Sequence, residues 1–190
     1  MGSTTPVRNA AASEARNATA SATSWGVASR PSGMVARRAS SLAGVTPPSN
    51  PSSIAVWLAA GAMELKPGAP FELTWRNGEL SDPPGQRPPG FGEEHSMKST
   101  IVEVAPPGRL VFTWGEKAEV AFELEPQGSQ VMLTVTHRRV TERGVLLNVS
   151  AGWHAHLDVL AARLGDRKPA TPFWDAWSGL KKEYEARMPE

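Results

Sequence analysis

Residues 145–164, VLLNVSAGWHAHLDVLAARL, constrain the fold more than any other stretch, because they predict one long amphipathic helix. Apolar residues recur there at three- and four-residue steps and so form a single stripe along an α-helix. The stripe consists of Val149, Trp153, Leu157, Leu160 and Leu164. Such a helix needs an apolar partner. The strand patterns directly before it supply one, which favours a ligand-pocket architecture over a catalytic one.

The segments before the helix alternate apolar and polar residues, as strands with one buried face do. They cover residues 71–75, 94–104, 109–114, 119–125 and 131–137, the second with less regular alternation. Pro/Gly turns separate them, so they predict an antiparallel meander whose apolar face the helix covers. The predicted fold class is α+β, a curved antiparallel sheet wrapped around a long C-terminal helix. A last helix at 172–188 is expected to pack on the outside.

Composition excludes several classes of function. Twenty basic and 19 acidic residues give a net charge of +1, which provides no polyelectrolyte attraction, so no nucleic-acid partner is predicted. The chain has no cysteine, which rules out disulfides and thiolate metal sites and suits a reducing compartment. No apolar run approaches the roughly 18 to 20 residues of a membrane span. We therefore expect a cytoplasmic protein without a cofactor.

The texture of the sequence changes near residue 55. Residues 1–55 are rich in Ala, Ser, Thr, Pro and Arg, and Glu14 is their one acidic residue. Three interpretations stay open for them: a disordered tail, an organellar transit segment, which would direct import, or a wrongly translated stretch. The folded domain is predicted to span 56–190.

Five pieces in order resemble a known family: FELTW, RLVFTW, VAFELEP, VMLTVTH and GWHAHLDVLAARL. This order is similar to the activator-of-heat-shock-ATPase-homologue-like branch of the SRPBCC superfamily, the START-like helix-grip proteins, over residues 57–164. The resemblance implies a β-α-α-β6-α fold whose sheet and C-terminal helix enclose a hydrophobic cavity. It also makes the 90-kDa heat-shock chaperone a candidate partner.

The start of the chain departs from this resemblance. Family members open with a strand and two short helices that end in a Trp-Leu pair, which Trp57-Leu58 matches, but residues 15–55 show no strand pattern. A frameshift restored near Val56 would explain this and would leave a sheet edge unpaired. A genuine divergent tail is the alternative.

The predicted ligand cavity takes its lining from the apolar faces of the strands and the helix. Large aromatic rings serve both packing and ligand contact, and simple core packing is the alternative for each. The candidate lining residues are Trp75, Phe91, His95, Phe112, Trp114, Phe122, Leu133, Val135, Trp153, His156, Leu157 and Leu160. Phe91 belongs to the Pro/Gly loop 81–92, which is either a stiff connection or a lid at the pocket mouth.

The histidines give no metal site and no predicted catalytic residue. His154 and His156 are two residues apart, so on a helix they point about 200° apart and cannot share an ion. His154 is expected to pair with Asp158 four residues on, while His156 points toward the cavity. His95 and His137 lie on strands, where a core or edge histidine competes with a general base.

The leading hypothesis is a non-enzymatic domain that binds a small hydrophobic or amphipathic molecule between sheet and C-terminal helix. One alternative is a co-chaperone-like activator of the 90-kDa heat-shock chaperone ATPase. The other is a cyclase- or hydrolase-like enzyme that uses a cavity histidine such as His95 or His156. No phosphate loop, GxGxxG, HExxH or GxSxG motif occurs, so ATP hydrolysis by the chain itself is not predicted.

Overall fold

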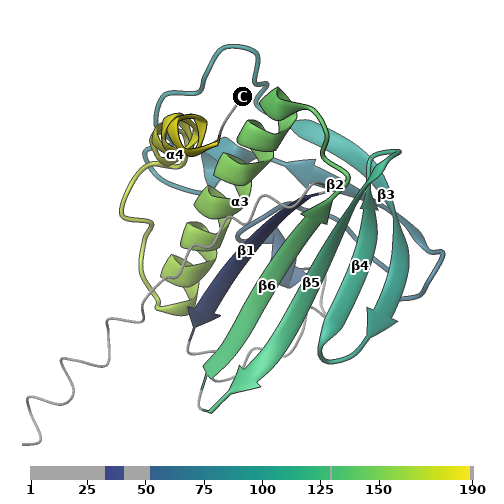
Figure 1. Cartoon of the computed structure of the whole chain (residues 1–190). Helices are drawn as coiled ribbons and strands as arrows, with labels where there is room; N and C mark the ends of the chain where they lie inside the picture. The colour runs from purple at the N-terminus through teal and green to yellow at the C-terminus, as the bar shows by residue number, and fades with distance from the viewer. Residues whose placement is uncertain (1–32, 41–51, 129, 189–190) are drawn as a thin grey trace, which may run out of the picture.

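A computed structural model describes residues 33–40, 52–128 and 130–188 (Figure 1). One curved sheet, two long helices near the C-terminus and short helical turns make up this part of the chain. The elements in chain order are β1 (Gly33–Ser40), α2 (Ser52–Ala55), β2 (Pro70–Trp75), η1 (Asn77–Glu79), β3 (His95–Ala105), β4 (Arg109–Trp114), β5 (Ala118–Gln127), β6 (Gln130–Arg138), α3 (Arg143–Leu164) and α4 (Phe173–Arg187).

The sheet has six strands in the order β1-β6-β5-β4-β3-β2, and every neighbouring pair is antiparallel. Its alternation follows the sequence: Phe71, Leu73 and Trp75 are buried, and the residues between them are less so. A register shift between Ile101 and Glu103 interrupts the β3–β4 ladder, and such a bulge bends a strand. The predicted α+β class, an antiparallel sheet with long C-terminal helices, is confirmed.

Helix α3 lies against one face of the curved sheet and contacts β1 (Figure 1). It begins two residues before the predicted start and ends at Leu164, where the Gly165 N–H bonds to the Ala161 carbonyl at 3.2 Å. Its sheet-facing Trp153 and Leu157 are buried. The helix predicted at 172–188 is α4, and it packs on α3.

Strand β1 corrects the expectation that residues 15–55 hold no strand. Gly33–Ser40 pairs with β6, from Gly33 opposite Arg138 to Ser40 opposite Val131. The segment reads GMVARRAS and lacks two-residue alternation, but an antiparallel ladder is held by backbone hydrogen bonds, which need no such pattern. The unpaired sheet edge that the frameshift interpretation implied is therefore not found at β6, which pairs with β1. Within the same predicted segment, Ser52–Ala55 forms the short helix α2, and residues 1–32 and 41–51 lie outside the described residues.

No helix within the described ranges is both long and apolar enough to cross a membrane.

Candidate ligand-binding site

Aromatic rings from the strands and from α3 meet at the helix–sheet interface. Trp114 on β4 lies 5.2 Å from Trp75 on β2 and 5.4 Å from Trp153 on α3, measured between ring centroids. Phe122 on β5 meets Trp153 edge-on at 5.8 Å and Phe112 at 5.5 Å. Edge-to-face and tilted pairs at these distances are favourable beyond the area that they bury. We call these five rings the aromatic interior.

The remaining apolar candidates belong to the same core. Leu133 and Val135 on β6 are buried, Leu157 on α3 is fully buried, and Leu160 is half-buried and packs against them. The structure thus brings together nine of the twelve predicted lining residues.

The other three candidates, Phe91, His95 and His156, lie away from the aromatic interior or at its edge. The Phe91 ring contacts Trp174 at 5.2 Å and Trp177 at 4.9 Å, both on α4. Its loop is fastened there, because the Gln86 N–H donates to Asp175 Oδ1 at 2.9 Å. His95 is exposed at the start of β3.

His95 stacks on the edge of the aromatic interior, 5.8 Å from the Trp75 ring. His156 is buried, with Nδ1 2.8 Å from the Trp57 carbonyl oxygen and its ring 4.9 Å from Phe173. A carbonyl oxygen only accepts, so His156 Nδ1 carries a proton. Burial lowers the pKa of His156 to about 4, against the opposing effect of this hydrogen bond. His156 is therefore a neutral side chain that ties α3 to the segment at Trp57.

His137 is the polar residue in this region that the lining prediction omitted. It is fully buried, its ring lies 5.0 Å from Trp114, and its Nδ1 accepts the Trp153 indole N–H at 3.2 Å. Burial lowers its pKa to about 4, so it is neutral. The signal was present in the sequence, since His137 continues the inward alternation of Leu133 and Val135 along β6.

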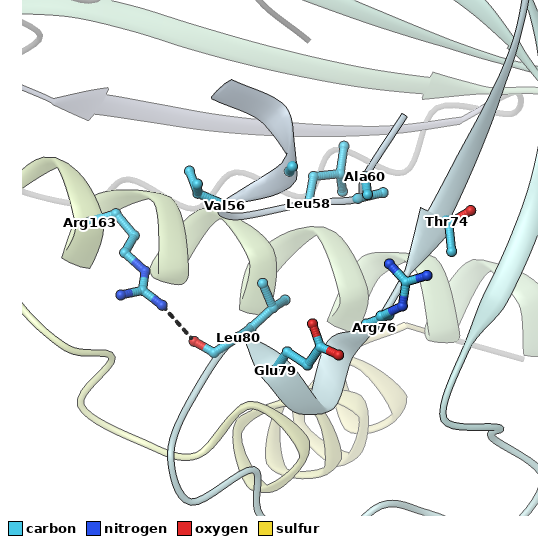
Figure 2. A pocket seen from close by; sticks show the side chains of 10 residues that line it. Val56, Leu58, Ala60, Thr74, Arg76, Glu79, Leu80 and Arg163 are labelled. Carbon is cyan, nitrogen blue, oxygen red and sulfur yellow. Dashed lines mark hydrogen bonds between the residues drawn. The ribbon is translucent and has the colours of Figure 1, made fainter. Parts of the chain in front are cut away.

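An open pocket lies beside the aromatic interior, between β2, η1 and α3 (Figure 2). Its volume is about 460 Å³, within the roughly 300 to 1,000 Å³ of small-molecule sites. It is lined by Ala55, Val56, Leu58, Ala59, Ala60, Thr74, Arg76, Glu79, Leu80 and Arg163. We call it the edge pocket. None of its residues is among the ligand contacts predicted from the sequence.

The edge pocket combines an apolar wall with two guanidinium groups. Figure 2 shows Arg163 and Arg76 at opposite sides of the pocket, with Leu58 and Leu80 between them. Arg163 Nη2 donates to the Leu80 carbonyl oxygen at 3.4 Å. Arg76 Nη2 lies 2.6 Å from a carboxylate oxygen of Glu94, and both side chains are about half exposed. This lining suits a ligand that has an apolar body and a polar head.

The segment 55–60 separates the edge pocket from the aromatic interior. The Trp57 ring lies 6.2 Å from Phe122, whereas the next residue, Leu58, lines the edge pocket. Backbone bonds between Ala60 and Thr74, at 2.8 and 2.9 Å, hold the end of this segment against the outer edge of β2. One short piece of chain therefore forms a wall of both regions.

Within the described ranges, no three His, Asp or Glu side chains lie close enough together to hold a metal ion. The predicted pair on α3 is present, with His154 Nε2 3.7 Å from Asp158 Oδ2. His154 Nδ1 also lies 3.0 Å from the Tyr184 hydroxyl on α4. The contact with Tyr184 joins α3 to α4.

Comparisons with known proteins agree with this geometry. The family model described as "Activator of Hsp90 ATPase homolog 1-like protein" matches residues 49–165. A Bordetella parapertussis protein solved by solution NMR shares 30% identity at a TM-score of 0.68, with 88% of this chain and 91% of that chain covered. No curated protein matches the chain.

Two more distant structures share the fold. CalU16 from Micromonospora echinospora is 19% identical with a TM-score of 0.55, and the match covers 81% of this chain and 86% of that one. A Mesorhizobium loti protein is 18% identical with a TM-score of 0.53, and the match covers 70% and 96%. At these identities the likeness concerns the fold alone.

Proposed function

The chain belongs to the activator of Hsp90 ATPase homolog 1-like family of the SRPBCC superfamily, and we propose that it binds a small amphipathic molecule without transforming it. The observation that carries this proposal is the edge pocket between β2 and α3, with its apolar wall and its two arginines. The apolar body of the ligand packs on Val56, Leu58 and Leu80. Its polar head accepts hydrogen bonds from Arg163.

Binding without catalysis agrees with the state of the histidines. His156 holds its Nδ1 proton against the Trp57 carbonyl, and His137 accepts from the Trp153 indole. Burial lowers the pKa of both rings to about 4, whereas an efficient general base at neutral pH has a pKa near the working pH.

The aromatic interior is the proposed inward extension of this site. The segment 55–60 has Trp57 on its inner side and Leu58 on its outer side. A ligand confined to the edge pocket leaves the NMR signals of the Trp114 and Trp153 indoles unchanged. A ligand that extends inward shifts both.

Saturable binding of a matched ligand series tests the proposal. Octanoate, octanol and methyl octanoate share one apolar chain and differ in the head group, and native mass spectrometry and thermal shift report their binding. We expect octanoate to bind most tightly, because Arg163 is positioned for a carboxylate. Loss of that preference in Arg163→Gln would locate the head group.

Two exposed valines provide a matched pair of variants. Val56 lines the edge pocket and is 54% exposed, whereas Val102 on β3 is 45% exposed and lies outside the lining. Val56→Trp fills the pocket and should abolish binding, while Val102→Trp should leave it intact. Binding that survives Val56→Trp, or a series in which nothing binds, would refute the proposal.

The family match favours one second candidate function, activation of a heat-shock chaperone ATPase. Stimulation of the ATPase of a purified 90-kDa heat-shock chaperone by this chain tests it. An unchanged turnover rate at saturating chain concentration excludes it.

A further inference from the structure

The hydrogen-bond partners of His137 determine which of its ring nitrogens carries the proton. The Trp153 indole N–H can only donate, and it lies 3.2 Å from His137 Nδ1. Nδ1 is therefore bare. Because the buried ring is neutral, its single proton is on Nε2.

This Nε2–H group has no acceptor among the described residues. The His137 side chain is 0% exposed, and Nε2 finds no hydrogen-bond partner in the described part of the chain. A buried donor without an acceptor destabilises the folded state, and native proteins rarely tolerate one. An acceptor from outside the polypeptide removes this cost.

Ser150 provides a second buried polar atom without a hydrogen-bond partner among the described residues. It precedes Trp153 by three positions on α3, so the two side chains leave the helix about 60° apart. Ser150 is 1% exposed, and its Oγ has no partner among the described residues. Even the carbonyl one turn back, the usual acceptor for a helical serine, is not used.

We propose that the aromatic interior is a binding site for an uncharged oxygen atom. This oxygen accepts a hydrogen bond from His137 Nε2–H and forms a second hydrogen bond with Ser150 Oγ. An ionised carboxylate does not suit this place, because the neutral ring provides no counter-charge and burying a lone ion is costly. A water molecule, or the carbonyl or hydroxyl oxygen of a ligand, carries the required chemistry. The site lies at the aromatic interior, the inward extension named under the proposed function. It shares no residue with the edge pocket, so a failure of ligand binding at the edge pocket would not remove it.

NMR on the full-length, ¹⁵N-labelled chain tests the proposal, with His156 as an internal control. His156 has a protonated Nδ1, whereas His137 has a bare Nδ1 and a protonated Nε2, so long-range ¹H–¹⁵N spectra should show two opposite tautomers. The His137 Nε2 proton should then show cross-relaxation to a bound water or to protons of a co-purified molecule. Mass spectrometry of a denaturing extract separates these two sources.

Other outcomes overturn the proposal. They are a protonated Nδ1 on His137, an Nε2–H coupled across a hydrogen bond to a protein carbonyl, or an Nε2–H with neither water nor ligand beside it. Each would show that no external oxygen is bound there.

Substitutions provide a second test. His137→Asn keeps an acceptor for the Trp153 indole but removes the Nε2 donor, so occupancy of the bound oxygen should fall about tenfold, the equivalent of one hydrogen bond. His156→Asn changes the other buried histidine and should leave occupancy unchanged. If His137→Asn does not fold, Ser150→Ala is the alternative variant, and unchanged occupancy in it would contradict the assignment.

Discussion

Acid should destabilise this fold through its two buried histidines. Burial lowers the pKa of His137 and of His156 to about 4, whereas an unfolded histidine titrates near 6.5. Between these values the unfolded chain binds a proton that the folded chain does not. The stability due to each neutral histidine is therefore complete above about pH 6.5 and is lost progressively as the pH falls toward 4.

The size of this effect follows from the two pKa values. A difference of about 2.5 units corresponds to roughly 3 kcal/mol per histidine once the pH has reached 4. At pH 5 the loss is about 2 kcal/mol for each, or about 4 kcal/mol for both. A domain with an ordinary stability of about 5 to 15 kcal/mol loses a large part of it.

Urea unfolding at pH 7.5 and pH 5, followed by tryptophan fluorescence, measures this loss. His137→Asn should lower the difference between the two pH values by about 2 kcal/mol, because asparagine does not titrate. His95→Asn, at the exposed histidine on β3, is the matched control and should leave the difference unchanged. A pH difference that His137→Asn does not reduce, or one that His95→Asn abolishes, would refute the reasoning.

Three further predictions concern the fold. Gly61→Ala places a Cβ 2.4 Å from the Glu72 carbonyl oxygen, so the β2 edge must shift, and chemical denaturation should show a loss of several kcal/mol, about the scale of a severe single substitution. Gly179→Ala lies inside α4, where a new Cβ meets no atom within 4 Å, and should raise stability by about 0.5 to 1 kcal/mol in the same assay; a loss would contradict this. Asp175→Ala removes the acceptor of the Gln86 N–H, so hydrogen exchange at Gln86 should accelerate, and unchanged protection would show that this bond does not hold the loop.

Much of the fold could be predicted because periodicity reports burial. Phe71, Leu73 and Trp75 alternate along the chain and are buried along β2. The three- and four-residue steps of the 145–164 stripe likewise placed Trp153 and Leu157 against the sheet. In both cases the apolar residues of the periodic pattern are the residues on the buried face of the strand or helix.

The edge pocket could not be predicted in this way, because its walls come from distant parts of the chain. Arg163 reaches the Leu80 carbonyl across 83 positions, and the wall at Leu58 lies there because Ala60 bonds to Thr74. No local pattern encodes such a juxtaposition. Strand β1 was not predicted for a different reason. It is held by backbone pairing with β6, and its residues do not alternate between apolar and polar.

The polar groups of the aromatic interior form a series of hydrogen bonds in which each donor or acceptor requires the next. A phenylalanine at position 153 would fill much the same space, but the Trp153 indole adds a buried N–H that requires an acceptor. His137 Nδ1 supplies it, and this fixes the histidine proton on Nε2, where a new donor then requires an acceptor of its own. Apolar side chains at both positions would remove the requirement at little cost. Because the described part provides no acceptor for the last donor, the series of hydrogen bonds is completed, in our proposal, by an oxygen atom from outside it.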